Sequence, residues 1–291
     1  MFSMIIPMHK KMILIFITTV MISYFWNVTA YNAGANHKSY YVFTAINTNG
    51  VLKAWGDSRF GAPNTISNVK DVCANKGATA VLKNDGTVQV IGSSTQNIPT
   101  GLTVTNVKKI YSTQTAFACL KTDGSVVAWG GDGGNDPGNL KNVREIFSTW
   151  SAFAAVKNDG SLVAWGQYMP NASSLSGVSD VYTIVSTWYA MAALRNDGTV
   201  VCFGNSAYGG SGPSGLNNVK SITATRSAFA ALKTSGTVVA WGDSARGGSG
   251  VPSSLNNVKA IYSTGFAFTA LKNDGTISSW GNSLYGGVAT S

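Results

Sequence analysis

The chain has 291 residues, of which 44% are hydrophobic and 11% are charged, and its formal net charge is +9. The hydrophobic content is enough for a large core, and the shortage of charge suits strands buried between neighbouring sheets. The odd count of three cysteines excludes a framework of disulfides, so we interpret Cys73, Cys119 and Cys202 as small buried hydrophobic residues.

Residues 1–30 are predicted to be a secretory signal peptide. Lys10 and Lys11 precede a largely apolar run of fifteen residues, and Val28 and Ala30 are small residues of the kind that a signal peptidase recognises. An uncleaved membrane anchor is the alternative, although fifteen residues fall short of the roughly 20 that cross a bilayer. Cleavage would leave 19 basic and 12 acidic residues, a net charge of +7, on a secreted or surface protein without membrane contact.

Residues 31–291 are predicted to be one domain of repeated hairpins. The best-formed copy, 152–166, has two short apolar runs around the turn Asn158-Asp159-Gly160, a sequence that reverses a chain readily. Each copy ends in an aromatic or aliphatic residue followed by glycine, at spacings of 36 to 39 residues. These residues are Trp55, Ile91, Trp129, Trp165, Phe203, Trp241 and Trp280. A fixed period of about 37 residues with several short strands indicates a propeller or a solenoid.

The repeat boundaries favour a closed seven-bladed β-propeller. Residues 31–39 are weakly patterned, residues 40–56 form a hairpin without a strong preceding strand, and six fuller units follow, each starting with a sequence like Asn142-Val143-Arg144. The chain thus begins late in one repeat and stops early in another, which predicts a ring closed by N- and C-terminal strands. The connection between units, such as 243–257, must cross the sheet again, which predicts roughly four antiparallel strands per blade.

This repeat resembles the regulator of chromosome condensation repeat family. In residues 231–248, Ala-Leu-Lys is followed by a glycine turn, valine, Trp-Gly and an Arg-Gly-Gly loop, and the likeness extends over residues 40–285. It is closest to the secreted bacterial branch of the type II β-lactamase inhibitory proteins and implies a seven-bladed propeller. Nuclear members often have a histidine at the corner before the second strand. No repeat here has one, so a nucleotide-exchange function on chromatin is not expected.

Catalytic and metal-binding residues are scarce. The only histidine outside the leader is His37, and no Ser-His-Asp set or closely spaced carboxylate pair is apparent. The loop 132–136 has oxygen donors for a hard cation but no following bidentate glutamate, so a plain loop is favoured over a metal site. The basic residues before the turns are spread around the ring and partly neutralised, which argues against a nucleic-acid partner. We expect no enzyme activity and no cofactor.

The corner between the first and second strand of each unit varies where the rest of the repeat is constant. Trp150, Trp188 and Tyr189 occupy two of these corners, and large aromatic residues on one face are typical of protein-binding hot spots. Further candidates at the same position are Tyr40, Tyr41, Gln114, Arg226 and Phe266. Packing into the grooves between blades is the alternative role. In the inhibitory proteins that the chain resembles, the matching corners carry many of the aromatic residues that contact the partner.

The sequence therefore predicts a secreted or surface binding protein, a monomer, that uses the corner face to bind a macromolecule. A protein is the first class of partner, and an inhibitor-like function is what the resemblance implies. A carbohydrate-binding, lectin-like propeller is the alternative, because aromatic rings also stack on sugars; the unequal corners count against repeated sugar sites. Asn171, in Asn171-Ala172-Ser173, is a candidate glycosylation site in a loop between blades.

Overall fold

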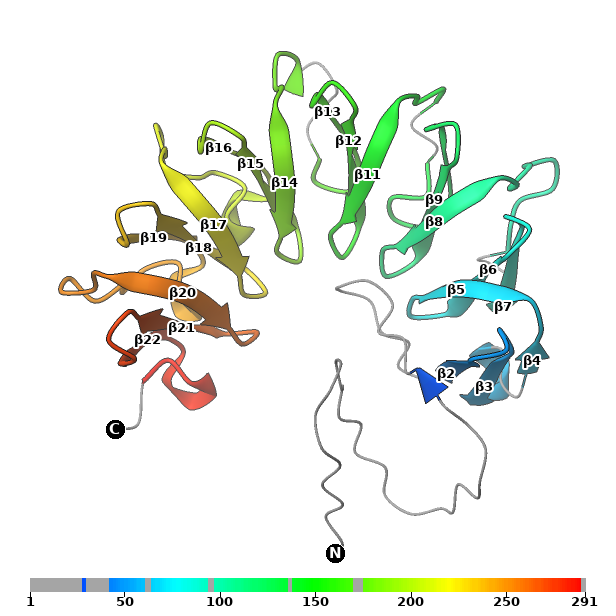
Figure 1. Ribbon diagram of the computed structural model, residues 1–291, viewed down its shortest axis with the longest axis horizontal. Helices are drawn as coiled ribbons and strands as arrows, with labels where there is room; N and C mark the ends of the chain where they lie inside the picture. Colours follow the sequence, from blue (N-terminus) through cyan, green and yellow to red (C-terminus); the bar gives the residue numbers. More distant parts are fainter. Residues whose placement is uncertain are drawn as a thin grey trace, which may run out of the picture.

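The computed structural model describes residues 28–29, 42–60, 64–93, 97–135, 138–169 and 175–288. These residues form seven antiparallel sheets that follow one another along an arc in sequence order, which we call blades 1 to 7 (Figure 1). The predicted all-β architecture of seven blades is confirmed. No helix in this part of the chain is long and apolar enough to cross a membrane.

Blade 1 contains β1 (Val28–Thr29), β2 (Val42–Asn47), β3 (Leu52–Gly56) and β4 (Asn64–Ile66). Blade 2 contains β5 (Val69–Ala74), β6 (Ala78–Lys83) and β7 (Val88–Gly92). Blade 3 contains β8 (Val107–Ser112), β9 (Ala116–Lys121) and β10 (Val126–Gly130). Blade 4 contains β11 (Val143–Ser148), β12 (Ala152–Lys157) and β13 (Leu162–Gly166). Blade 5 contains β14 (Val181–Ser186), β15 (Ala190–Arg195) and β16 (Val200–Gly204). Blade 6 contains β17 (Val219–Ala224), β18 (Ala228–Lys233) and β19 (Val238–Gly242). Blade 7 contains β20 (Val258–Ser263), β21 (Ala267–Lys272) and β22 (Ile277–Gly281).

Blades 2 to 7 have three strands each, so the prediction of four was wrong. The connection from Asp243 to Asn257 crosses back through a 3-10 turn, η5 (Ser244–Arg246), and a loop. Gly247 and Gly250 in this connection have φ angles of 91° and 79°. Such left-handed backbone is incompatible with a strand, which explains why no fourth strand forms.

Blade 1 does have a fourth strand, because β4, in the connection to blade 2, pairs with β3. Its edge strand β1 pairs with β2 through Val28 and Thr29, two residues that the leader prediction assigns to the removed segment. Among the described residues, no C-terminal strand joins this sheet. After β22 the chain passes through η6 (Ser283–Tyr285) and Gly286, whose φ of 94° ends the extended run. Figure 1 accordingly shows blades 1 and 7 at the two ends of the arc.

Neighbouring blades are joined at the turn edge by backbone hydrogen bonds. The Val181 N–H donates to the carbonyl of Gly160 in the preceding turn at 3.1 Å, and the Val219 N–H donates to Gly198 at 2.9 Å. The same bond occurs at each joint between consecutive blades, with donors Val69, Val107, Val143 and Val258. The repeated Asn-Asp-Gly and Asn-Val-Lys sequences are therefore two sides of one blade joint.

Between the edges, blades 3, 4, 6 and 7 each pack a phenylalanine and a tryptophan against the small-residue face of the blade before them. Phe229 and Trp241 of blade 6 lie against Ala190, Ala192 and Leu194 of blade 5. The two rings are stacked, with centroids 5.2 Å apart. The Trp241 indole N–H donates to the Gly209 carbonyl at 3.0 Å, so the buried ring has its polar atom satisfied.

Blade 1 presents the same aromatic face without a described blade in front of it. Phe43 and Trp55 occupy the positions of Phe229 and Trp241, and their rings stack with centroids 5.9 Å apart. Phe43 is 65% exposed and Trp55 49% exposed, whereas Phe229 is fully buried. Position along the arc, rather than sequence, therefore decides how much apolar surface this pair buries.

We predict that Phe229→Ala lowers the free energy of unfolding by about 3–5 kcal/mol, as expected when a buried ring is removed. Phe43→Ala, the matched change at the exposed end, should cost less than about 1 kcal/mol. Urea unfolding followed by circular dichroism measures both. Equal losses would contradict the open arc, because Phe43 would then be covered in solution by blade 7 or by a second molecule.

The turn aspartates give stability a defined dependence on pH. The Asp197 carboxylate accepts hydrogen bonds from the Thr199 hydroxyl at 2.7 Å and N–H at 2.8 Å. These bonds lower the pKa of Asp197 below its ordinary value of 3.8. The pKa is lowered in the same way, by the hydroxyl and N–H of a serine or threonine two residues later, at Asp85, Asp123, Asp159 and Asp274.

Because the native pKa lies below the unfolded one, ionised aspartates stabilise the fold above about pH 4, and this stabilisation is lost as the pH falls through the lowered pKa. We expect a urea midpoint that changes little from about pH 7 to 5 and drops below about pH 4. Asp197→Asn should reduce the slope of that drop. A slope unchanged in this variant would mean that other carboxylates control acid unfolding.

Candidate functional site

The corners of consecutive blades are connected by a second series of backbone hydrogen bonds, at the edge opposite the turns. The Gln114 N–H donates to the Trp150 carbonyl at 2.8 Å, Trp150 to Trp188 at 2.9 Å, and Trp188 to Arg226 at 2.9 Å. Lys76 precedes this series and Gly265 ends it. Because only backbone atoms take part, a corner can carry any side chain that fits, which explains why its sequence varies.

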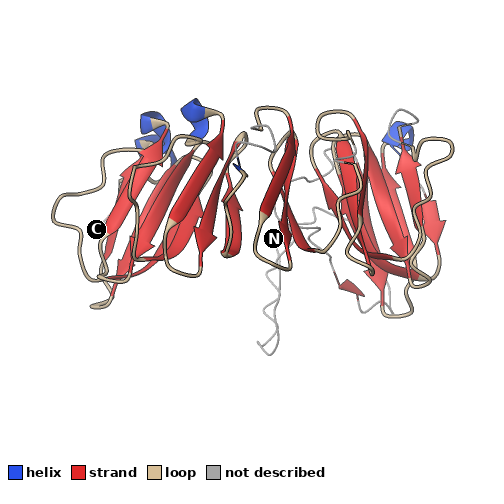
Figure 2. Cartoon of the chain, turned by 90° about the horizontal axis from the view of Figure 1, so that it is seen from above, coloured by secondary structure: helices blue, strands red, loops and turns tan. Residues whose placement is uncertain are grey.

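In blades 5, 6 and 7, a threonine before the corner fixes the adjoining 3-10 turn. The Thr187 hydroxyl donates to the carbonyl of Tyr208, the last residue of η4 (Ser206–Tyr208), at 2.9 Å. The Thr225 and Thr264 hydroxyls make the same bond to Arg246 and Tyr285, each at 3.1 Å. Figure 2 shows the 3-10 turns together at one edge of the molecule. Tyr208, Arg246 and Tyr285 therefore border the corners and belong to the same face.

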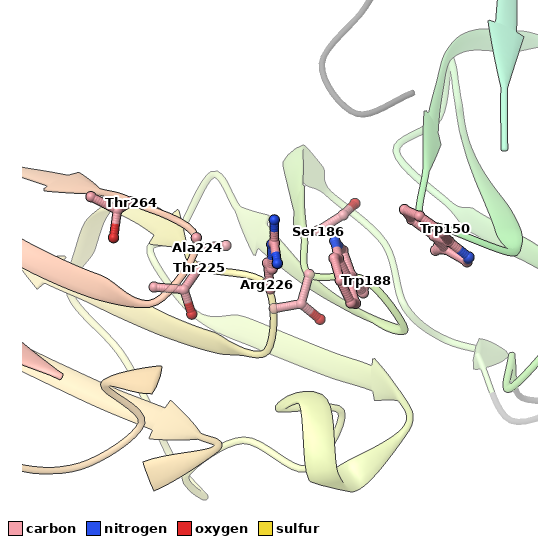
Figure 3. A pocket seen from close by; sticks show the side chains of 9 residues that line it. Trp150, Ser186, Trp188, Ala224, Thr225, Arg226 and Thr264 are labelled. Carbon is pink, nitrogen blue, oxygen red and sulfur yellow. The ribbon is translucent and has the colours of Figure 1, made fainter. Parts of the chain in front are cut away.

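Trp150 and Trp188 come together at the centre of this face. Their ring centroids are 5.0 Å apart and the planes are inclined by 38°. With Arg226, Thr225 and the neighbouring corner backbone they line a hollow of about 180 Å³. Figure 3 shows Trp150, Trp188 and Arg226 in a row, each from a different blade. Both rings are partly exposed, so they are available for contact in a way that the buried Trp-Gly rings of blades 3, 4, 6 and 7 are not.

Arg226 and Phe266 extend the row into blades 6 and 7. The Arg226 guanidinium carbon lies 4.7 Å from the centroid of the Trp188 ring and 4.5 Å from that of Phe266. Phe266 in turn stacks on Tyr285 with centroids 4.4 Å apart. The structure thus brings together four sequence-predicted residues from blades 4 to 7: Trp150, Trp188, Arg226 and Phe266.

Tyr189 lies in a second aromatic group beside the row. Its ring makes edge contacts with Tyr168 at 5.3 Å and with Tyr208 at 4.8 Å between centroids. Partial burial raises the pKa of the Tyr189 hydroxyl, with smaller contributions from the neighbouring tyrosines and Asp132. Sequence reasoning missed Tyr168; its position two residues after Gly166 was the signal, since residues after Trp-Gly also supply Tyr208 and Tyr285.

The other predicted residues are less closely connected to this face. Gln114 takes part in the corner series through its backbone, and its side chain is partly buried outside the aromatic row. Tyr40, Tyr41 and Asn171 lie outside the described residues, as does residue 136 of the suggested cation loop. No group of three histidine, cysteine or acidic side chains suited to a metal occurs among the residues that the structure describes.

The cysteines are unpaired and sit in the blade interiors, as predicted. Cys73 and Cys119 are buried and Cys202 is partly buried. Burial raises the pKa of the Cys73 thiol to about 12. Because only the thiolate is a good nucleophile, this residue is unsuited to covalent chemistry at neutral pH.

No protein-family model and no curated protein sequence matches the chain. Among solved structures, the chain is similar to the ectodomain of the receptor kinase CR4 from Physcomitrella patens, with 15% identity over 84% of this chain and 72% of that one and a TM-score of 0.49. It is also similar to the CRINKLY WD40 ectodomain of the Arabidopsis thaliana receptor kinase ACR4, with 14% identity over 86% of this chain and 94% of that one and a TM-score of 0.48. Yeast RCC1 (Prp20), whose structure was solved bound to Kap60, is similar with 15% identity over 84% of this chain and 69% of that one and a TM-score of 0.45. Such similarities concern the fold alone, so function is argued from the corner face.

We predict that Trp188→Ala changes the free energy of unfolding by about 1 kcal/mol or less, because the ring is partly exposed and the backbone holds the corner. Trp241→Ala, which removes a buried and hydrogen-bonded ring, should cost about 3–5 kcal/mol. Chemical denaturation of both variants provides the comparison. If Trp188→Ala destabilised the protein as much as Trp241→Ala, the corner tryptophan would be structural rather than available for binding.

Proposed function

We propose that this protein is a non-catalytic binding protein whose corner face captures a macromolecule, with a protein as the partner. The observation that carries the proposal is the row Trp150, Trp188, Arg226 and Phe266, four partly or fully exposed side chains from four blades in continuous contact. Tryptophan, tyrosine and arginine are the residue types that dominate binding energy in protein interfaces.

The shape of the face favours a broad partner over a small ligand. The hollow of about 180 Å³ is smaller than most sites for drug-sized molecules, which are about 300–1,000 Å³. The aromatic contacts, by contrast, continue from Trp150 to Tyr285 across consecutive blades. A surface of this kind can contact several side chains of a protein partner at once, whereas a small ligand would cover only part of it.

The hydroxyls of Thr187 and Thr225, the residues before two of the corners, are engaged in the fold, which counts against their use in catalysis or sugar binding. Thr225 Oγ1 accepts a hydrogen bond from the Ala228 N–H at 3.0 Å and lies within bonding distance of the Arg246 carbonyl at 3.1 Å. Thr187 is held in the same way by Ala190 and Tyr208. Neither hydroxyl contacts a general base within the described residues. The lectin-like alternative would therefore depend on ring stacking with few free polar partners.

Export is part of the proposal and rests on the leader-like sequence of residues 1–30. We infer that the protein acts outside the cell or at its surface, as a monomer, and that an inhibitor-like mode of action is one use of such a face. Cleavage after Ala30 would also remove β1 and leave β2 at the edge of blade 1.

The proposal predicts that Trp150→Ala/Trp188→Ala abolishes partner capture while circular dichroism stays unchanged. Loss of two hot-spot rings should weaken binding by about 2 kcal/mol each. The measurement is affinity capture from the producing organism's surface and surroundings, with the captured protein then purified and titrated. A control variant, Tyr182→Ala/Ile277→Ala, removes two exposed apolar side chains, 64% and 53% exposed, from the turn edge.

Capture that depends on the tryptophans and survives the control changes supports the corner face. Equal capture by the wild type and the double tryptophan variant contradicts the proposal and points to the turn edge with its lysines. A glycan array provides the separate test of the alternative: specific glycan binding that requires Trp150 and Trp188 would replace the protein partner by a carbohydrate.

A further inference from the structure

Arg226 is the one exposed corner cation that is held rigidly without a counterion. Two ring faces, Trp188 and Phe266, flank its guanidinium at 4.7 and 4.5 Å. Within the described part of the chain, its side chain takes part in no hydrogen bond or ion pair. A planar guanidinium between two rings is held by contacts to its faces, and its N–H groups, which lie in the plane of the guanidinium itself, stay available at its edge.

Arg246, the neighbouring cation, is already neutralised. Its Nη1 donates to the Asp243 carboxylate at 2.5 Å and to the Ser227 hydroxyl at 3.0 Å. The Arg246 guanidinium lies 5.5 Å from the same Phe266 ring, so both cations border one aromatic surface. Only Arg226 contributes an uncompensated charge there, and it is a single positive charge.

Gly265 contributes to the fixed position of Arg226. A Cβ atom at residue 265 would lie 3.0 Å from Arg226 Nε and 3.4 Å from its Cδ. The backbone of the next corner therefore leaves just enough room for the side chain to lie flat between the rings. An arginine ordered before binding loses less conformational freedom when it pairs, which favours specific recognition over a loose surface contact.

We propose that Arg226 is a carboxylate-recognition site: the partner presents an aspartate or glutamate to the guanidinium edge and an adjacent apolar side chain to the hollow that Trp150 and Trp188 help to line. This inference rests on the proposed function and specifies the chemistry of the partner segment. A carboxylate fits the two-pronged edge of one arginine. A phosphate group carries nearly two charges and is usually bound by several arginines, which this face lacks because Arg246 is paired.

The test begins with a phage-displayed library of random peptides, selected on the immobilised full chain. Peptides that bind the wild type and not Trp150→Ala/Trp188→Ala are kept, and the best is synthesised. We expect an aspartate or glutamate at one fixed position next to an apolar residue. Titration should show about a tenfold loss of affinity for Arg226→Gln, a similar loss when the peptide carboxylate becomes an amide, and little further loss when both are changed.

Lys76→Gln is the matched control, because it removes an exposed corner cation at the far end of the hydrogen-bonded series. It should leave the affinity of the peptide unchanged. The urea unfolding midpoint of Arg226→Gln is measured as well. If it equals that of the wild type, a loss of binding in this variant does not come from a loss of folded protein.

The outcomes separate the two proposals. Tryptophan-dependent peptides that lack a conserved acid, or that bind Arg226→Gln as well as the wild type, overturn the carboxylate site and leave the binding face intact. A phosphoserine version of the peptide that binds more tightly than the glutamate version also overturns it. No selectable peptide, or peptides indifferent to the tryptophans, count against both proposals.

Discussion

The hydrogen bond from the first valine of a blade to the turn glycine of the preceding blade sets the geometry on which the structure depends. It requires unusual backbone on both sides: Gly160 has a φ of 78°, and a Cβ there would lie 2.7 Å from the Asp180 nitrogen. Asp180 itself has a φ of 58°, a conformation that asparagine and aspartate tolerate best. Fixing this edge brings the aromatic face of blade 6 onto the alanines of blade 5, the preceding blade, and this burial of apolar surface stabilises the fold.

The opposite edge follows a different rule, which explains why binding side chains gather there. Carbonyl and N–H groups of consecutive corners satisfy one another, as from Trp150 to Trp188 and from Trp188 to Arg226. No side chain is needed to keep these blades in register, so mutation can change the corners without loss of the fold. The turn edge has the reverse property, since its glycines and asparagines are dictated by the backbone. One edge of the propeller is therefore fixed by structure and the other is open to selection for binding.

Periodicity made the blades and their hairpins predictable, because each short strand repeats with its turn seven times in the sequence. The clustering of Trp150, Trp188, Arg226 and Phe266 also followed from alignment of the repeats. Two features did not: the pairing of β1, and the position of Arg226 between two rings. The last depends on the distance between neighbouring corners, which a repeat alignment does not contain. Tyr168 was missed because it comes two residues after Gly166, whereas Tyr208 and Tyr285 come four residues after the corresponding glycines.

Among the residues that the structure describes, the two ends of the arc present complementary faces that do not meet. Blade 1 exposes Phe43 and Trp55, and blade 7 exposes Ile277 on the side that in other blades meets such an aromatic pair. The aromatic row of the corner face lies over blades 4 to 7, whose mutual joints are all formed. Its geometry is therefore supported by complete interfaces on each side of Trp188 and Arg226.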